Sequence, residues 1–275
     1  MMTGRPIDHV VLAVHDLDRA AARFLKSGFT LTPRACHDDR MGTSNRLIQF
    51  SGRNSVEVLE VDRPGTLARH DFSASPAFFG FGDHHRLSLD RREGLSMLVF
   101  ASDDARADLR RFEAASLPAF RPFDFERQAR LPDGTAVIVG FTLAYTSSPG
   151  MPGIGLAVCQ NRAPELLWKP DYQSHANGAR TIGAVYVASD APDRDAAFLA
   201  AMFGGGIAPA AGGFSIACGP SQEVRVVSPQ TVAAIDPSFD AGTPVLAGLR
   251  VVSDAARPAI PVSQLCGMFI EWAAP

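Results

Sequence analysis

The fold is decided by residues 7–29, IDHVVLAVHDLDRAAARFLKSGF, which predict a strand, a capped corner and a helix. The branched aliphatic residues of VVLAV favour a buried strand. Asp16 follows as a helix cap, because its carboxylate can accept hydrogen bonds from the unpaired amides of the first turn. Gly28 then supplies a C-terminal stop. The apolar stripe of the helix comprises Ala20, Ala21, Phe24 and Leu25.

The same order of strand, Asp-rich corner and Ala-rich helix recurs along the chain. Later copies open with LSMLVFAS at residue 95, TIGAVYVAS at residue 181 and VLAGLRVVS at residue 245. Further strand-like runs follow at 46–50, 55–61, 136–145, 153–160, 214–218, 223–227 and 268–272. Pro258 and Pro261 oppose a long helix in the last copy, which is therefore truncated. We predict an α+β fold of four βαβββ modules forming two half-barrels, over residues 1–178 and 179–275.

The composition excludes several functional classes. With 275 residues, 46% of them hydrophobic and 20% charged, the chain can bury a core. A net charge of −3 gives no basic footprint for nucleic acid. No apolar run approaches the roughly 18 residues of a membrane span, and the opening MMTGRPIDHVVLAV does not resemble a signal peptide. The four cysteines form no CxxC pair, which disfavours a disulfide scaffold and a structural zinc and favours a cytoplasmic location.

Two segments stand outside the repeat. Residues 63–94 form an insertion rich in Phe, Gly, His and Asp, which could be a lid over a pocket or an ordered surface loop. Its His84-His85 pair is expected in solvated loop. Residues 202–213, MFGGGIAPAAGG, are expected to form a flexible loop, because they lack the Lys-Ser/Thr pair of a phosphate-binding loop.

The strand–helix opening, VEVLEV (56–61), GTSNRLIQF (42–50), PELLWKPDYQSHANGA (164–179) and MFIEW (268–272) together resemble the bacterial glyoxalase-like domain family. This family is part of the vicinal oxygen chelate superfamily, with glyoxalase I, extradiol dioxygenases and bleomycin-resistance proteins. The resemblance implies paired modules, each pair curling around a cleft. In metal-dependent members, each paired module gives one metal ligand from its first strand and one from its last. The metal then acts as a Lewis acid on two substrate oxygens.

The family pattern assigns His9 and Glu57 as the two metal ligands of module one. The corresponding positions in the later modules are Ser96 and Gly155, then Gly183 and Glu223, then Ala247 or Gly248 with Glu271. Neither module pair therefore keeps four ligands. A third ligand is needed for a credible catalytic site, and the candidates are His175 and, second, His37. The resemblance thus implies one divalent ion (Zn, Mn, Fe or Ni), or none.

Each of these residues also has a structural interpretation. His9 and Glu57 could be a buried histidine and its carboxylate partner. His175 could bond loop backbone around a turn at Asn177-Gly178. Glu271 is expected to be a structural or surface carboxylate.

Other residues could contact a substrate. Asn45 offers a two-sided amide, and Arg46 offers a fork for a carboxylate or phosphate. Arg162 lies just past a strand end, where it could meet a substrate anion. Trp168, Tyr172 and Phe50 could wall an apolar pocket or belong to the core.

Three functions remain open for a chain of this pattern. One is a metal-assisted lyase, isomerase or dioxygenase acting on a small oxygenated molecule, with Glu57 or a bound hydroxide as catalytic base. The alternative is a metal-free protein that binds or sequesters a small molecule, as bleomycin-resistance proteins do. The third is a scaffold or dimerising protein, and a homodimer is compatible with each. We expect the main cleft in the N-terminal module pair.

Overall fold

The computed structural model describes residues 4–130, 135–239, 242 and 244–275. The first three residues of the segment MMTGRPIDHVVLAV therefore lie outside the described residues. Module one comprises β1 (Ile7–Ala13), α1 (Leu17–Lys26), β2 (Ala35–Cys36), β3 (Ser44–Gln49) and β4 (Ser55–Glu60). After α2 (Phe81–Leu89), module two comprises β5 (Gly94–Ala101), α3 (Ala105–Ala114), β6 (Phe123–Arg130), β7 (Ala136–Thr146) and β8 (Gly155–Asn161). Two short helices follow, α4 (Pro164–Leu167) and the 3₁₀ helix η1 (Pro170–Tyr172).

The second half repeats the plan in a shorter form. Module three comprises β9 (Ala179–Ala188), α5 (Pro192–Phe203), β10 (Ile207–Ala210), β11 (Gly213–Cys218) and β12 (Gln222–Val227). It is followed by α6 (Pro229–Ile235). Module four keeps β13 (Val245–Ser253) and β14 (Phe269–Ala273), and no helix joins them in the described part of the chain.

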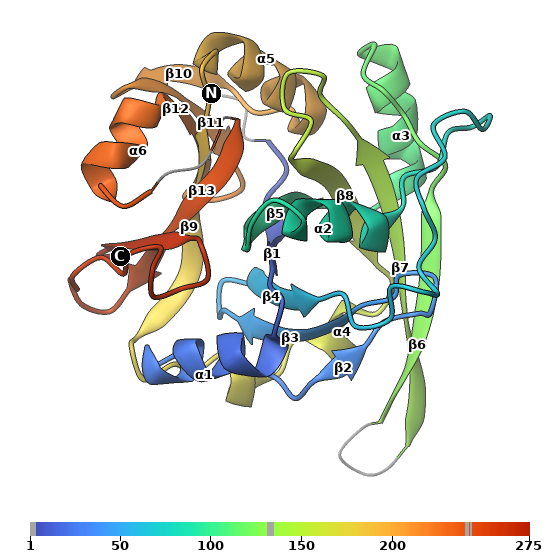
Figure 1. Ribbon diagram of the computed structural model, residues 1–275, viewed down its shortest axis with the longest axis horizontal. Helices are drawn as coiled ribbons and strands as arrows, with labels where there is room; N and C mark the ends of the chain where they lie inside the picture. Colours follow the sequence, from blue (N-terminus) through green and yellow to red (C-terminus); the bar gives the residue numbers. More distant parts are fainter. Residues whose placement is uncertain (1–3, 131–134, 240–241, 243) are drawn as a thin grey trace.

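The strands form two sheets with related topology. The eight-stranded sheet has the order β2-β3-β4-β1-β5-β8-β7-β6 and forms a half-barrel (Figure 1). Its centre repeats one pattern twice, because β1 pairs in parallel with β4, β5 pairs in parallel with β8, and β1 and β5 are antiparallel. The six-stranded sheet has the order β10-β11-β12-β9-β13-β14. The expected α+β, glyoxalase-like fold is therefore confirmed.

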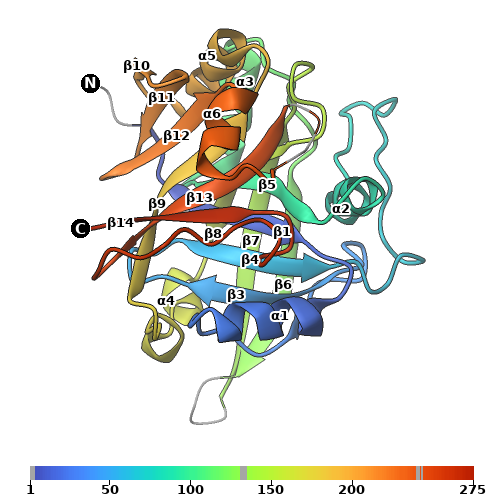
Figure 2. The same cartoon turned by 60° about the vertical axis from the view of Figure 1, so that its left-hand side comes forward.

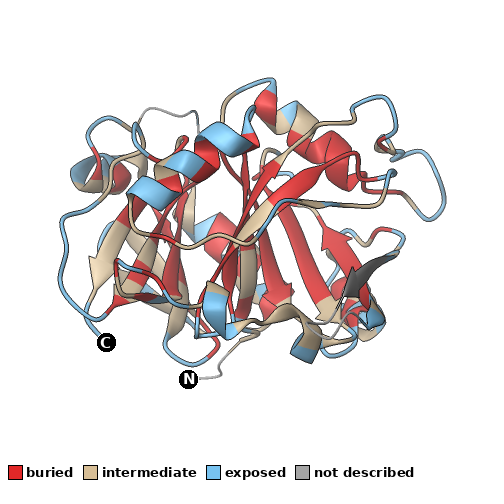
Figure 3. Ribbon diagram, turned by 90° about the horizontal axis from the view of Figure 1, so that it is seen from below, coloured by how far each residue is buried: buried red, intermediate tan, exposed pale blue. Residues whose placement is uncertain are grey.

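One core joins the two halves. Apolar residues from both sheets and from α1, α3 and α5 form a single buried cluster, and the rings of Phe100 on β5 and Phe203 on α5 stack 4.2 Å apart within it. The two sheets lie against each other in Figure 2, and buried residues run along the strands in Figure 3. Separate apolar clusters cover the other face of each sheet. The division into 1–178 and 179–275 remains our proposal for the domains; β9 begins at Ala179.

The helix starts follow the predicted capping in two modules of three. The side chain of Asp16 accepts from the Arg19 amide, and Asp104 accepts from the Ala107 amide. In module three, α5 has no side-chain cap bond, because it begins after Ala191 with a proline at its first turn. The predicted stripe of α1 was wrong at Leu25, whose side chain is exposed while Leu17 takes the buried position.

Two loop predictions were wrong. Residues 202–213 contain strand β10, which pairs with β11. The insertion at 63–94 contains α2, and His84 and His85 of this helix are buried instead of solvated. No helix among the described residues is long and apolar enough to cross a membrane.

Candidate active site

A pocket opens on the face of the eight-stranded sheet that is turned away from the shared core. The space inside it and at its open mouth amounts to about 590 Å³. Its polar lining comes from module one and its connecting loop: Asp8, His9, His37, Asn45, Ser55 and Glu57. Its apolar lining comes largely from module two and α2, and includes Phe81, Phe125, Phe141, Leu143, Cys159 and Leu167. The pocket thus has one polar wall and one apolar wall.

His9 is held in one orientation by its neighbour in sequence. The Nδ1–H of His9 donates to Asp8 Oδ1 at 2.5 Å, so Nε2 is left facing the pocket. Both side chains reach the pocket because the pairing of β1 with β5 shifts register between Ile7 and His9. Burial alone would lower the pKa of His9, but the hydrogen bond to Asp8 and the negative charges of Asp8 and Glu57 raise it above its ordinary value. His9 is therefore disposed to carry a proton.

Glu57 is the central acceptor of the polar wall. Its Oε1 accepts from Asn45 Nδ2 at 2.6 Å and lies 3.3 Å from His37 Nε2. Its Oε2 lies 3.6 Å from His9 Nε2, which is beyond hydrogen-bond length. One carboxylate oxygen is thus fixed by the protein, and the other is turned toward His9 and the pocket.

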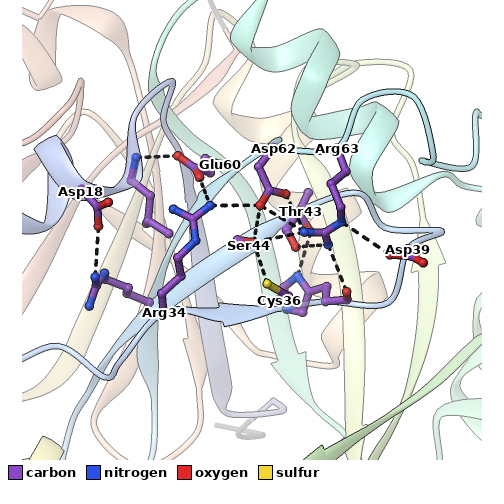
Figure 4. Close-up of polar contacts among 12 residues, drawn as sticks. Asp18, Arg34, Cys36, Asp39, Thr43, Ser44, Glu60, Asp62 and Arg63 are labelled. Carbon is purple, nitrogen blue, oxygen red and sulfur yellow. Dashed lines mark hydrogen bonds and ion pairs between the residues drawn. The ribbon is translucent and has the colours of Figure 1, made fainter.

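The loop that carries His37 is held by Arg63, which lies outside the pocket lining. Arg63 donates from Nη2 to the backbone carbonyls of His37 (3.1 Å) and Thr43 (3.0 Å), and from Nη1 to Asp62 (3.0 Å). Figure 4 shows Arg63 between Asp62, Thr43 and Asp39. Within the loop, Nδ1 of His37 bonds the hydroxyl of Thr43 at 2.8 Å. The imidazole of His37 is consequently positioned by a charged network outside the pocket.

Helix α2 occupies the second half of the site. His84 Nε2 donates to the carbonyl of Ser96 at 2.8 Å, and His85 Nδ1 bonds the hydroxyl of Ser96 at 2.9 Å. Burial lowers the pKa of His84 to about 4 and that of His85 well below its ordinary value, so both are neutral at pH 7. Nε2 of His85 and Oη of Tyr145 are buried without a hydrogen-bond partner in the described structure. The positions that correspond to His9 and Glu57 in module two are therefore covered by the insertion.

The convergence of His9, Glu57 and His175 expected from the sequence does not occur. Nδ1 of His175 accepts from the Thr30 amide at 3.0 Å, and its Nε2 donates to the carbonyl of Gln49 at 2.8 Å. Both ring nitrogens are used by backbone groups, and His175 does not line the pocket. Its pKa is lowered, mainly by burial. The backbone-bonding alternative is the one that the structure shows.

The two arginines expected at the substrate lie elsewhere. Arg46 extends to Asp18 of α1 at 3.0 Å, on the opposite side of the sheet from the pocket. Arg162 donates to Glu126 at 2.9 Å and to the hydroxyl of Thr142 at 3.1 Å. Each guanidinium therefore already has a carboxylate partner within the chain.

The expected aromatic wall is built from other residues. Trp168 and Tyr172 are half-buried outside the lining, and Phe50 belongs to the shared core, where its ring contacts that of His175. The aromatic lining consists of Phe81, Phe125 and Phe141 instead. Asp8 was also missed, because strict strand alternation would place it on the face opposite His9. Of the predicted site residues, the pocket brings together His9, His37, Asn45 and Glu57.

Comparison with known proteins assigns the family. A family model described as a glyoxalase-like domain matches residues 7–203. The chain belongs to the glyoxalase-like domain family. The resemblance to the vicinal oxygen chelate superfamily is confirmed with it. No curated protein sequence matches the chain.

Solved structures share the fold of this glyoxalase-like chain. A hypothetical protein from Staphylococcus aureus aligns over 98% of this chain and 99% of its own, with a TM-score of 0.75 and 14% identity. The Mn(II)-bound glyoxalase from Novosphingobium aromaticivorans aligns over 100% and 83%, with a TM-score of 0.54 and 11% identity. A mutant 4-hydroxymandelate synthase from Streptomyces coelicolor aligns over 92% and 72%, with a TM-score of 0.51 and 17% identity. At these identities the likeness establishes the fold alone.

The donors of this glyoxalase-like site do not make a complete metal set. His9 and Glu57 suit two positions of one, because Asp8 orients the imidazole as carboxylates do for metal-bound histidines. Within the described residues, however, no three His, Cys, Asp or Glu side chains are grouped to hold a metal.

The second sheet has a guanidinium at the equivalent carboxylates. Arg250 Nη1 donates to Glu223 at 3.1 Å and its Nε donates to Glu271 at 3.0 Å. Tyr186 Oη donates to Glu271 at 2.5 Å, and burial together with this bond raises the pKa of Tyr186 to about 12. The carboxylates of modules three and four are therefore both paired with Arg250 of the same chain.

Proposed function

We propose that this chain is a small-molecule enzyme of the glyoxalase-like class that moves a proton on an oxygenated substrate, as an isomerase or lyase does. The observation that carries the proposal is the pairing of Glu57 Oε2 with His9 Nε2, 3.6 Å apart at the edge of a pocket with an apolar wall. A base and a proton donor separated by this distance can act on adjacent atoms of one substrate.

Each residue of the polar wall has a separate role in this reaction. Glu57 Oε2 takes the proton from a carbon next to a carbonyl, so that the C–H pair moves into the new C=C bond. In the protonated form of His9, which the hydrogen bond to Asp8 favours against the effect of burial, the Nε2–H stabilises the developing negative charge on the carbonyl oxygen. Asn45 holds the other Glu57 oxygen in place. In an α-hydroxycarbonyl substrate, Glu57 returns this proton to the former carbonyl carbon while the hydroxyl proton moves to the other substrate oxygen. The carbonyl and hydroxyl groups thus exchange places, and no oxidant is needed.

A metal-assisted form of this reaction is a separate question. A divalent ion such as Zn, Mn, Fe or Ni would supply Lewis-acid polarisation of the carbonyl. With His9 and Glu57 as its two protein ligands, it would be held weakly unless further ligands complete its shell. Metal analysis of protein purified without chelator, for wild type and His9→Ala, tests this form independently of turnover.

Proton exchange tests the proposal directly. Wild-type protein is incubated in D₂O with a panel of small α-hydroxycarbonyl compounds, with and without EDTA, and loss of the α-proton signal is followed by NMR. We expect exchange that falls by about 10²–10⁴-fold in Glu57→Gln. Glu126→Gln is the matched control, since this exposed carboxylate pairs with Arg162 outside the pocket. Exchange that persists in Glu57→Gln would contradict the proposal.

The second candidate is a metal-free protein that binds or sequesters a small molecule. The apolar wall and the covered module-two positions favour it. The α-proton exchange measurement distinguishes the two functions, because a sequestering protein binds its ligand without any Glu57-dependent exchange. A cytoplasmic location and a homodimer remain predictions under both.

A further inference from the structure

The apolar wall of the pocket offers a ligand no strong hydrogen-bond partner. None of its described side chains carries nitrogen or oxygen, and its only heteroatoms are the sulfurs of Met41 and Cys159. Thioether and thiol sulfurs are weak hydrogen-bond partners. A hydroxyl or charged group of a ligand would therefore give up its water at this wall without replacement, which is costly. The wall selects an apolar group, whatever chemistry takes place at the polar wall.

Two phenylalanines of module two give this wall an aromatic surface. Phe125 on β6 stands directly opposite Phe141 on β7 in the antiparallel pair, and their rings stack with centroids 5.0 Å apart and planes 18° from parallel. Leu143, two residues further along β7, lies on the same face and also lines the pocket. Aromatic rings pack in offset or edge-on contacts that add to the gain from buried area. A ring on the ligand matches this surface better than an alkyl chain does.

Phe81 closes the pocket on the side of helix α2. Its side chain is buried, and its ring centroid lies 4.4 Å from that of His85, which is itself bonded to Ser96. The next residue, Gly82, packs the start of the helix directly against the loop, since a Cβ there would collide with the carbonyl oxygen of Met41. The ring of Phe81 is therefore backed by packed side chains, and a larger ligand would have to move α2 to displace it.

The imidazole of His37 connects Phe81 to the aromatic surface. It meets Phe81 edge-on at a centroid distance of 5.8 Å and Phe125 edge-on at 6.2 Å. Phe81 and Phe125 are thus each one ring contact away from the same group of the polar wall. The apolar space between them is consequently about one ring wide.

We infer that the ligand of this pocket is an α-hydroxycarbonyl compound with one apolar ring attached, and that Phe81 sets the upper size of that ring. The inference rests on the proposed function for the oxygenated end of the ligand, whereas the ring and its size limit follow from the apolar wall alone. Polyhydroxylated compounds and compounds with fused rings fall outside this class.

Three uncharged probes that share the α-hydroxycarbonyl group test the inference on the full-length protein. They carry a methyl group (hydroxyacetone), a phenyl group (2-hydroxyacetophenone) or a 2-naphthyl group in its place, and their dissociation constants are measured by ligand-observed NMR. We expect the phenyl probe to bind at least about ten-fold more tightly than the methyl probe, because it buries more apolar surface. The naphthyl probe should bind at least about five-fold more weakly than the phenyl probe, since it would have to displace Phe81. Equal binding of the methyl and phenyl probes, naphthyl binding as tight as phenyl binding, or no binding of the phenyl probe at millimolar concentration would overturn the inference.

Phe81→Ala removes the proposed size limit. In this variant the naphthyl probe should bind at least about five-fold more tightly than the phenyl probe, which reverses the wild-type order. The matched control is Phe78→Ala, which removes a buried ring of the same apolar cluster outside the pocket lining and should keep the wild-type order. If Phe81→Ala does not fold, Phe81→Leu should bring the two affinities within about two-fold of each other. A folded Phe81 variant that keeps the wild-type order, or a reversal in Phe78→Ala as well, would show that Phe81 does not set the limit.

Binding and proton exchange together separate this inference from the proposed function. Phenyl-selective binding that Phe81 limits, without any Glu57-dependent exchange, would defeat the proposed function alone. Glu57-dependent exchange at equal affinity for the methyl and phenyl probes would defeat this inference alone.

Discussion

The imidazole of His84 occupies the space that Gly155 leaves free on strand β8. A Cβ placed on Gly155 would lie 2.8 Å from His84 Nε2 and 2.6 Å from the methyl group of Met97. Gly155 stands where module one has Glu57, so the position of a last-strand carboxylate in module two is filled by a helix of the insertion. The two modules have therefore diverged into a polar half-site and a packed apolar half.

This contact predicts the effect of one methyl group. Gly155→Ala should lower the free energy of unfolding by about 1–3 kcal/mol, because both neighbours must move in a filled interior. Gly65→Ala is the matched control, since a Cβ there would meet nothing within 4 Å. Urea denaturation of both variants measures the difference. An unchanged midpoint for Gly155→Ala would mean that α2 does not occupy this space in solution.

The repeat could be predicted from the sequence because local pattern determines it. Strand periodicity, the helix caps at Asp16 and Asp104 and the prolines of module four act within a few residues, so the module order followed directly. Strands β2, β6 and β10 were missed because pairing with a neighbouring strand, and not their composition, defines them. The truncation of module four was predicted for the same local reason.

The site was only half predictable, because its other half depends on contacts between distant segments. The polar residues around His84 and His85 predict exposure to solvent, yet both side chains are buried against Ser96, which lies on strand β5. Asp8 reaches the pocket through a register shift that alternation does not reveal. His175 lies on a long connection whose course is decided by Thr30 and Gln49.

Acid should weaken the fold through His84. Its pKa falls from an ordinary 6.5 to about 4 on folding, so the unfolded chain takes up the proton first as the pH drops. The stabilisation is complete above pH 6.5 and is lost between pH 6.5 and 4, by on the order of 3 kcal/mol. His85 has the same sign, whereas the raised pKa of His9 has the opposite one and favours the folded state at low pH.

Urea midpoints at pH 7 and pH 4.5 measure this dependence. His84→Gln should be less stable at pH 7 but should lose less stability on acidification than wild type. His15→Gln, a change at an exposed histidine, should follow wild type. If His84→Gln keeps the full acid sensitivity, other groups carry it.

His175→Phe should separate stability from binding. The variant loses two hydrogen bonds to backbone, and the amide of Thr30 and the carbonyl of Gln49 are left without their partner. We expect a loss of about 2 kcal/mol in the free energy of unfolding. Because His175 does not line the pocket, the rate of Glu57-dependent α-proton exchange should stay within two-fold of wild type. A selective loss of ligand or metal binding at unchanged stability would show that His175 belongs to the site.

Arg63→Lys should loosen the pocket wall from outside. An ammonium cannot reproduce the fork that reaches the carbonyls of His37 and Thr43 while it also pairs with Asp62. We expect a stability loss of about 1–3 kcal/mol and faster hydrogen exchange at the amides of 37–43. The matched control is Arg19→Lys, whose guanidinium makes an exposed pair with Glu93 and should cost less than about 0.5 kcal/mol. Since His37 adjoins Glu57, the rate of Glu57-dependent α-proton exchange on the substrate should fall as well. Destabilisation with unchanged exchange at 37–43 would show that Arg63 serves only as the counter-ion of Asp62.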